Sequence, residues 1–186
     1  MGLREEKKAK TRKAISDLAT SLFIERGYDN VTTAEIARQA EVSVPTLFKY
    51  FPTKESLVFD EDHEQEEKLL NAVTKRRSSV SILDALCEEL LDASALNPDN
   101  VENYRVFNRL IDSTPELSAY SKKMWMRYEE SLAKLLQKQS KKSLGTFEAE
   151  AIAHFILDSA HRSMRAPDPR KALHAMFKVL KEGWDE

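Results

Sequence analysis

The chain has 186 residues, of which 41% are hydrophobic and 32% are charged, and its net charge is −2. This balance predicts a soluble protein of one or two small domains, and the few glycines and prolines favour an all-α fold. The sequence shows no apolar run of membrane length and no secretory signal, and its single cysteine, Cys87, excludes an internal disulfide. We therefore expect a cytoplasmic protein with no membrane partner.

Positive charge is concentrated at the N-terminus. Residues 1–13 contain six Lys or Arg and two Glu, and residues 1–56 hold ten basic against eight acidic side chains. The rest of the chain holds nineteen basic and twenty-three acidic side chains. A basic N-terminal segment suits a place beside DNA phosphate, but it also suits a solubilising tail, and the composition leaves both open.

A first helix is predicted from about Lys8 to Arg26, because apolar residues recur there with helical spacing. They are Ile15, Leu18, Ala19, Leu22 and Phe23. Gly27 is expected just beyond the helix, where a left-handed backbone conformation favours glycine.

Two helix starts follow only eleven residues apart. Thr32 is a good N-cap, and Glu35 completes a capping box for a helix that ends near Ala40. Ser43 caps a further helix, predicted over residues 44–50. This spacing leaves room for two turns of helix, a sharp corner and another helix, which is typical of a helix-turn-helix that inserts its second helix into the DNA major groove.

Residues 9–58 resemble the DNA-binding domain of the TetR family of transcriptional regulators, of the TetR/AcrR type. The residues that carry the resemblance are AISDLATSLFIERGYDNVTTAEIARQAEVSVPTLFKYFPTKESLV, about a quarter of the chain. The resemblance implies an all-α chain of about nine helices. It would have an N-terminal three-helix DNA-binding domain over residues 1–53 and a helical regulatory and dimerisation domain over residues 54–186.

The candidate DNA-contacting residues lie mainly on the second helix of the motif, where Leu47 and Phe51 are expected to face the core. They are Thr33, Val44, Pro45, Thr46, Lys49, Tyr50 and Lys54. Lys49 can donate to guanine or phosphate, while Thr46 and the apolar pair before it suit thymine methyl groups. The resemblance implies that Tyr50 and Lys54 contact the DNA backbone.

Two positions depart from the family pattern. Glu41 stands in the turn where the family commonly has Gly, and a left-handed conformation there costs about 1 kcal/mol. Val44-Pro45 stands where the family often has Lys-Gly, which leaves fewer polar groups for base contacts. Proline is acceptable at this place because it lies in the first helical turn.

A fourth helix is predicted over residues 54–75, with Thr53 as its N-cap. Within it, Asp60, His63 and Glu67 share one face and offer a conceivable divalent-cation site. The preferred interpretation is a solvated acidic face, and no metal or cofactor is expected.

Three more helices are predicted over residues 82–95, 101–113 and 115–139, where the resemblance implies a small-molecule pocket. The candidate pocket residues are Cys87, Tyr104, Phe107, Asn108, Trp125 and Tyr128. Aromatic walls with a few polar groups suit a ligand site, but the same pattern is typical of a packed core. Cys87 can be a redox sensor or a small buried hydrophobe.

After a loop at residues 140–145, an eighth helix is predicted from a Thr146 cap to about Met164. A ninth helix begins at Asp168-Pro169, and its apolar stripe ends at Trp184. The resemblance implies that these two helices join a second copy in a four-helix bundle. The candidate interface residues are Phe155, Ile156, Ala160, Phe177 and Leu180.

On the eighth helix, His154, Asp158 and His161 have a spacing that suits zinc. An interfacial hydrogen-bond network is the preferred interpretation.

These patterns together predict a sequence-specific DNA-binding transcriptional regulator. The resemblance implies a homodimeric repressor that a small molecule releases from a palindromic operator. An enzyme is not expected, since the sequence has no Gly-rich phosphate loop and no nucleophile elbow. The alternative is a helical interaction module that has lost DNA binding, but the presence of Thr33, Tyr50 and Lys54 argues against it.

Overall fold

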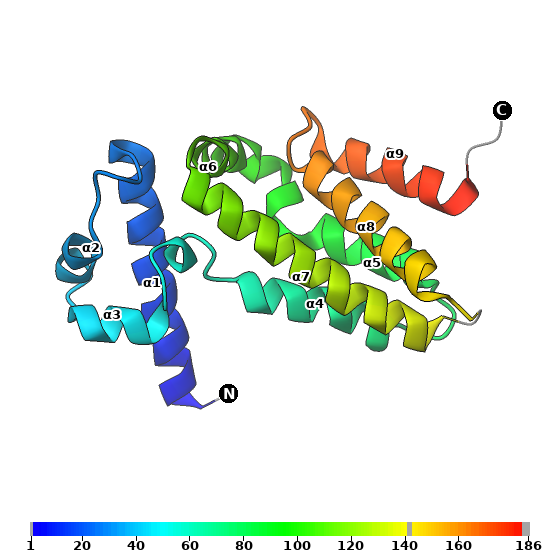
Figure 1. The fold of residues 1–186 in the computed structure, drawn as a ribbon, viewed down its shortest axis with the longest axis horizontal. Helices are drawn as coiled ribbons and strands as arrows, with labels where there is room; N and C mark the ends of the chain where they lie inside the picture. The colour runs from blue at the N-terminus through cyan, green and yellow to red at the C-terminus, as the bar shows by residue number, and fades with distance from the viewer. Residues whose placement is uncertain (1, 141–142, 184–186) are drawn as a thin grey trace. The chain divides into compact units, whose positions relative to one another are not determined.

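The structure is a computed structural model that describes residues 2–140 and 143–183. Part of the predicted loop, residues 141–142, and the predicted stripe residue Trp184 lie outside the described residues. The α-helices are α1 (Leu3–Arg26), α2 (Thr33–Gln39), α3 (Val44–Tyr50), α4 (Asp62–Thr74), α5 (Ile82–Asp92), α6 (Val101–Ser113), α7 (Pro115–Gln139), α8 (Thr146–Ser163) and α9 (Pro169–Glu182) (Figure 1). Three short 3-10 helices are η1 (Glu55–Leu57), η2 (Ser94–Leu96) and η3 (Pro98–Asn100). The predicted all-α fold is confirmed.

No helix in the described part of the chain is long and apolar enough to cross a membrane.

The main correction concerns the fourth predicted helix. Over residues 54–75 the chain forms η1 and an irregular segment before α4 begins. The Ser56 N–H donates to Thr53 Oγ1 at 3.2 Å, and the Ser56 hydroxyl donates to the Thr53 carbonyl at 2.7 Å. The Leu57 carbonyl accepts from the Ser16 hydroxyl at 2.7 Å rather than from a helical N–H. These local and tertiary bonds close a tight turn where the sequence analysis predicted a continuous helix from a Thr53 cap.

Three other boundaries differ from the prediction. α1 begins earlier, at Leu3, and α5 ends earlier, at Asp92. The N-cap of α8 is Gly145 rather than Thr146, because the Glu148 carboxylate accepts from the Gly145 N–H at 2.7 Å.

The chain divides into two compact units. The first unit is Met1–His63 with Arg109–Ser121, and the second unit is Glu64–Asn108 with Lys122–Glu186. Helices α4, α6 and α7 contribute residues to both units. The first unit therefore includes more than the segment 1–53, and the predicted domain boundary after residue 53 stays a prediction.

The core of the first unit forms where the apolar stripe of α1 meets α2, α3 and the segment that follows α3. Its most deeply buried side chains are Ile15, Ala19, Phe23, Val31, Ile36, Ala37, Leu47, Phe51 and Leu57. Each is at most 1% exposed, so the predicted inward faces of the three helices are confirmed.

Arg12 of α1 fixes the end of α3. Its Nη1 donates to the Tyr50 carbonyl at 2.5 Å, and its Nε and Nη2 donate to the Asp60 carbonyl at 3.2 and 3.0 Å. The guanidinium also lies 4.5 Å from the centroid of the Phe51 ring. Tyr50 is the last residue of α3, so its carbonyl has no acceptor role inside that helix. One side chain therefore holds both the end of α3 and the segment before α4 on α1.

The turn between α2 and α3 confirms the strained position at Glu41, whose φ is 55°. This left-handed residue reverses the chain, so that the Glu41 N–H donates to the Arg38 carbonyl and the Val42 N–H to the Ala37 carbonyl. A side chain at Glu41 makes this conformation less favourable than it would be for glycine.

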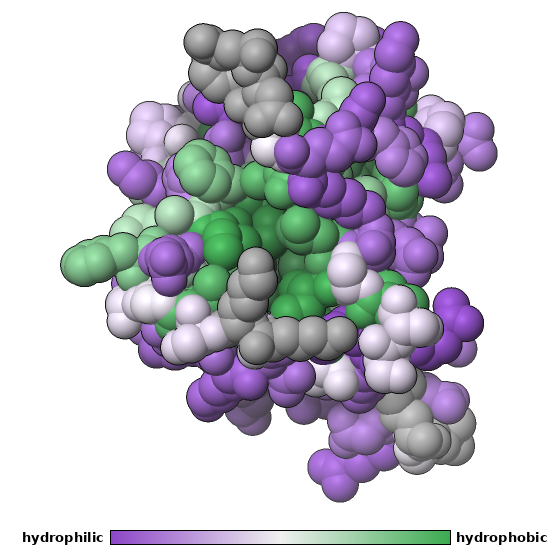
Figure 2. Space-filling view, turned by 90° about the vertical axis from the view of Figure 1, so that its right-hand side faces the viewer, coloured by the Kyte–Doolittle hydropathy of each residue, from purple (hydrophilic) through white to green (hydrophobic). Residues whose placement is uncertain are grey.

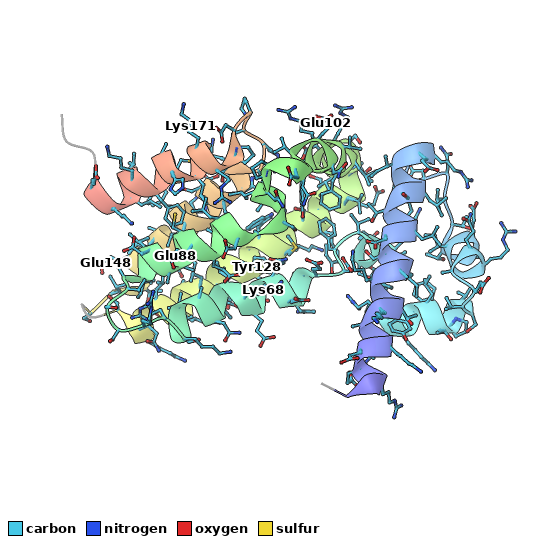
Figure 3. The ribbon with its side chains drawn as sticks, turned by 180° about the vertical axis from the view of Figure 1, so that it is seen from behind. Lys68, Glu88, Glu102, Tyr128, Glu148 and Lys171 are labelled. Carbon is cyan, nitrogen blue, oxygen red and sulfur yellow. The ribbon has the colours of Figure 1, made fainter. Side chains whose placement is uncertain are left out.

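The second unit has one hydrophobic core to which α4, α5, η2, α7, α8 and α9 all contribute. Its fully buried members are Val73, Leu86, Leu96, Leu132, Ala149, Ala153, Ile156, Ala160 and Leu173. α9 packs on α8 and α5 (Figure 1). Figure 3 shows Tyr128 among the helices of this unit, whereas Lys68 and Lys171 lie at its periphery.

A polar contact joins α4 to α7 within the second unit. The Glu66 carboxylate accepts from Arg127 Nε at 2.9 Å and from the Ser131 hydroxyl at 2.6 Å. The Glu66 side chain is only 14% exposed, so this contact is better shielded from water than the surface ion pairs.

Replacing Arg12 by methionine should lower the free energy of unfolding by about 2–4 kcal/mol, because two carbonyls lose charge-assisted hydrogen bonds. The matched control is Lys13→Met, which removes a neighbouring charge whose only recorded ion pair among the described residues is the exposed one with Asp17. That control should change stability by no more than about 0.5 kcal/mol. Urea unfolding followed by circular dichroism at one protein concentration compares them, and equal losses would contradict the assigned role of Arg12.

Glu41→Gly should stabilise the protein by about 0.5–1 kcal/mol, because glycine adopts the observed left-handed conformation without strain. Ala34→Gly is the control, since Ala34 is exposed within α2 and should lose about 0.5–1 kcal/mol. The same urea titration measures both variants. Destabilisation by Glu41→Gly would show that the turn is not strained.

Candidate nucleic-acid interface

Both predicted N-caps of the helix-turn-helix are formed. The Thr32 hydroxyl accepts from the Glu35 N–H at 3.2 Å, and the Ser43 hydroxyl accepts from the Thr46 N–H at 3.2 Å. The Glu35 carboxylate accepts from Arg26 Nη1 at 2.5 Å, which links the end of α1 to α2. The hydrogen bond from Arg26 lowers the pKa of Glu35 below its ordinary value.

α3 has one buried side and one side open to solvent. Leu47 and Phe51, four residues apart, are 0% exposed and fix the inward face. Pro45 and Lys49 are exposed, and partial exposure is shared by Val44, Thr46 and Tyr50. The outward side therefore presents the predicted base- and phosphate-contacting residues of α3 together.

Two hydroxyl groups of the predicted interface differ in how firmly they are held. The Thr46 hydroxyl lies 2.7 Å from the Ser43 hydroxyl, so its orientation is fixed by the helix cap. Thr33 is the first residue of α2 and is partly exposed. Both side chains can still accept or donate a hydrogen bond at the surface.

Lys54 is placed differently from what the sequence suggested. It precedes η1 instead of opening a long helix, and its Nζ donates to the Tyr28 carbonyl at 2.6 Å. The amine lies 4.0 Å from the Tyr28 ring centroid and 5.3 Å from that of Phe23, a cation–π arrangement. Burial lowers the pKa of Lys54. In this arrangement the amine stabilises the first unit, and its predicted phosphate contact stays a prediction.

The Tyr28 side chain completes this polar cluster. Its hydroxyl donates to Glu55 Oε1 at 3.0 Å, and burial together with this bond raises the pKa of Tyr28. Burial also acts to raise the pKa of Glu55, but hydrogen bonds from its own backbone, Thr53 and Tyr28 outweigh it and lower that pKa. Tyr28, Lys54 and Glu55 therefore hold the end of α1 to η1.

Phe48 is a residue that the sequence analysis missed. It lies on α3 beside Lys49 and is 42% exposed, which is unusual for a large aromatic side chain. The signal was available, because Leu47 and Phe51 already occupy the inward face and place Phe48 one step around the helix. An exposed ring at this position can contact thymine methyl groups or sugars.

The six predicted pocket residues all lie in the second unit, on α5, α6 and α7. Cys87 and Tyr128 belong to the buried core, and Tyr104 and Trp125 pack against it. The rings of Tyr104 and Phe107 meet edge to face with centroids 5.9 Å apart. The structure thus brings most of these residues to one apolar cluster.

Polar groups are interleaved with these rings. Asn108 Nδ2 donates to the Met164 carbonyl at 3.3 Å, and the Tyr104 hydroxyl lies 2.8 Å from the Ser94 hydroxyl. The Trp125 ring has an edge-to-face contact with Tyr128, with centroids 5.6 Å apart. Aromatic walls with a few oriented polar groups are the lining that a small-molecule site requires.

Burial raises the pKa of the Cys87 thiol. A raised pKa keeps the group protonated near neutral pH, where a thiol is a weak nucleophile. This favours the interpretation of Cys87 as a small buried side chain over a redox sensor.

The predicted dimer residues divide into two groups. Ile156, Ala160 and Phe177 are at most 2% exposed and lie in the core of their own second unit, so their prediction as contacts to another copy is corrected. Each helix stripe faces inward because α8 and α9 pack on each other. Phe155 is 55% exposed and Leu180 is partly exposed.

Apolar side chains remain on the surface of the second unit. Val179 of α9 is 57% exposed and Phe147 at the start of α8 is 85% exposed, and the sequence analysis named neither. Figure 2 faces the end of this unit where α7, α8 and α9 reach the right of Figure 1, and it shows apolar atoms gathered amid hydrophilic ones. Large exposed apolar patches are typical of surfaces that contact other molecules.

The histidines of α8 have separate partners. His154 Nδ1 lies 3.1 Å from Glu129 Oε1, and the His161 ring contacts the Trp125 ring edge to face. Asp158 accepts from Arg162 Nε at 2.5 Å. Across residues 2–140 and 143–183, no group of three or more His, Cys, Asp or Glu is arranged to hold a metal ion.

Comparison with known proteins places this architecture in a family. The sequence profile described as bacterial regulatory proteins, tetR family, matches residues 15–60. A protein of Mycobacterium tuberculosis, MftR, named as a candidate mycofactocin biosynthesis transcriptional regulator, is 29% identical over 177 residues, covering 92% of this chain and 89% of that protein. The HTH-type transcriptional regulator TcmR of Streptomyces glaucescens is 32% identical over 85 residues, covering 46% of this chain and 38% of TcmR.

Solved structures agree over nearly the whole chain. Salmonella enterica GusR matches with a TM-score of 0.59 at 21% identity, covering 93% of this chain and 96% of GusR. NalD of Pseudomonas aeruginosa, the secondary repressor of the MexAB-OprM multidrug efflux pump, matches with a TM-score of 0.58 at 21% identity, covering 96% of this chain and 97% of NalD. At these identities the structures show the fold alone. The profile match over residues 15–60, the regulators similar in sequence and the helix-turn-helix together support a DNA-binding transcriptional regulator of the TetR family.

Proposed function

We propose that the protein is a homodimeric transcriptional repressor that binds a palindromic operator and leaves it when a small molecule occupies the second unit. The observation that carries the DNA-binding part is the outward side of α3, a helix that Ser43 caps and that Leu47 and Phe51 anchor to the core. NalD, which shares the fold, is the secondary repressor of an efflux pump. We therefore propose repression rather than activation for this protein.

We assign base and backbone contacts to the open side of α3. Lys49 supplies a cation for guanine or phosphate, and Thr46 with Val44 and Pro45 supplies apolar and hydroxyl contacts for thymine. Tyr50 and Thr33 serve as backbone contacts, and Phe48 adds apolar area. Lys54 keeps its internal role unless DNA draws the amine away from Tyr28.

We place dimerisation on α8 and α9, through side chains that the protomer leaves exposed. Phe155 and Val179 are each more than half exposed, and Leu180 is partly exposed beside Val179. A two-fold dimer presents two α3 helices to DNA, and each can read one half-site about one helical turn, roughly 34–36 Å, from the other. The protein would act in the cytoplasm, where the operator DNA is.

We assign the effector to the aromatic residues of the second unit around Trp125 and Tyr128, within the regulatory domain predicted over residues 54–186. A ligand shifts the population of DNA-competent dimers only if it binds one conformation more tightly than the other. The polar contact of Glu66 with Arg127 and Ser131 joins two helices of this unit and would be sensitive to such a shift. Members of this family are regulators, and we assign no reaction to the chain.

The function is tested by selecting 30-base-pair duplexes from a random-sequence library with the purified full chain. We expect enrichment of an inverted repeat whose half-sites lie about 10 base pairs apart or a multiple of that spacing. Fluorescence anisotropy should then show roughly a thousandfold tighter binding to the selected duplex than to a scrambled one at 0.15 M salt, the low end of the range for specific binders. If no sequence is enriched, the result would favour the alternative, a helical interaction module that does not bind a specific DNA sequence.

Lys49→Ala should weaken binding to the selected duplex by roughly 10- to 100-fold, because one charged contact in the groove is lost. The matched control is Lys138→Ala, which removes an exposed lysine of α7 in the second unit. The control should bind as the unaltered protein does, and both variants should keep its circular dichroism spectrum. Equal affinities of the two variants would remove Lys49 from the interface.

A further inference from the structure

The first turns of α1 carry positive charge that the fold does not use. Arg4, Lys7, Lys8 and Lys10 are all exposed. Within the described part of the chain none of these four forms an ion pair, whereas Lys13 pairs with Asp17 at 2.8 Å. The helix was predicted to begin at about Lys8, but the structure includes the residues from Leu3 onward in α1. The charges are therefore displayed on a regular helix.

The helical register gives this charge a direction. Residues four apart lie on one face of a helix, and Arg4, Lys8 and Arg12 follow that spacing. Arg12 bonds to the carbonyl of Tyr50, the last residue of α3. Arg4 and Lys8 are here called the α1 basic face. They extend, toward the N-terminus, the side of α1 from which Arg12 bonds to the end of α3.

Lys10 and Lys13 point elsewhere. At 3.6 residues per turn, each lies about 120° or more around the helix from both members of the α1 basic face. They carry the same charge at nearly the same place in the sequence. They are therefore a matched comparison for the direction of the charge.

Helix stability does not explain the α1 basic face. The positive end of the helix dipole lies at the N-terminus, so cations in the first turns destabilise a helix, whereas Glu5 and Glu6 are favourable there. The residues of these turns from Arg4 to Lys10 bury nothing, since all are exposed. A bound anion beside Arg4 and Lys8 would turn this unfavourable arrangement into a favourable one.

We propose that Arg4 and Lys8 bind the phosphate backbone of the DNA duplex next to the half-site that α3 reads. Arg4 and Lys8 are separated by about 6 Å along the helix, a length that spans roughly two phosphates of one strand. Phosphate contacts carry no base information, so this face adds affinity and orientation rather than sequence preference. The proposal rests on the proposed DNA-reading function.

The test compares two double variants of the full-length protein that lose the same charge. Arg4→Gln with Lys8→Gln removes the α1 basic face, and Lys10→Gln with Lys13→Gln removes charge from the other side of the helix. The probes are the selected 30-base-pair duplex and its scrambled version. Anisotropy titrations at several salt concentrations give the slope of log affinity against log salt, and circular dichroism verifies that both variants stay helical.

Each lost phosphate contact should reduce the magnitude of this slope by about 0.9. In the Arg4/Lys8 variant the magnitude of the slope should therefore fall by about 2 if one protomer's α1 basic face contacts the DNA, and by about 3–4 if both do. Its affinity at 0.1 M salt should be at least tenfold weaker. Its loss should be equal on the selected and scrambled duplexes, whereas Lys49→Ala should reduce the ratio between them. The Lys10/Lys13 variant should change the slope by less than about 1.

Equal slope changes in the two double variants would overturn the proposal, because they would show long-range charge without a directed contact. An unchanged slope in the Arg4/Lys8 variant would also overturn it. These results differ from failure of the proposed function, in which the unaltered protein itself would bind selected and scrambled duplexes equally. The ratio of affinities for the selected and scrambled duplexes, measured on the unaltered protein, tests sequence-specific binding. The two double variants test the α1 basic face.

Discussion

The helix-turn-helix depends on the bonds that Arg12 makes to the backbone. α3 has only two turns, and so short a helix is not stable by itself. Its inward side is anchored by Leu47 and Phe51, and its C-terminal carbonyl at Tyr50 is held by the guanidinium of Arg12. The same guanidinium holds the Asp60 carbonyl. One planar, always charged group thus sets where α3 ends and where the chain turns toward α4.

The neighbouring contacts follow the same rule, in which a polar side chain satisfies a backbone carbonyl that no helix can pair. Ser16 binds the Leu57 carbonyl, and Lys54 binds the Tyr28 carbonyl. Buried carbonyls need such partners, and the segment after α3 cannot supply them as a continuous helix. A residue type that suits phosphate can therefore be used inside the unit instead, as the Lys54 amine is. Lys49 on α3 and the α1 basic face, in contrast, are exposed to solvent.

The second unit shows why helical periodicity alone identifies a ligand site or an interface poorly. Cys87, Tyr128 and Trp125 join one apolar cluster, and the same aromatic residues serve a pocket or a core. On α8 and α9 the stripe residues Ile156, Ala160 and Phe177 are used within the protomer. Phe155 and Val179 lie outside the stripe and are exposed, so they are the side chains available to contact a second copy. The family resemblance therefore predicts the helical arrangement of this unit, whereas burial determines which side chains are available for a second copy or a ligand.

The sequence by itself determined the features that short-range chemistry controls. It located the caps at Thr32, Ser43 and Asp168, the left-handed residues Gly27 and Glu41, and the boundaries of α3, α6 and α7, because hydrogen bonds and steric limits within a few residues fix them. It also identified the residues of α3 that face outward, apart from Phe48. Only the tertiary structure decided the break before α4, the inward use of Lys54 and the burial of three predicted interface residues. In those cases the contacting residues include some that lie far along the chain. The pattern of an apolar stripe, or a single lysine, does not identify which distant residue it will contact.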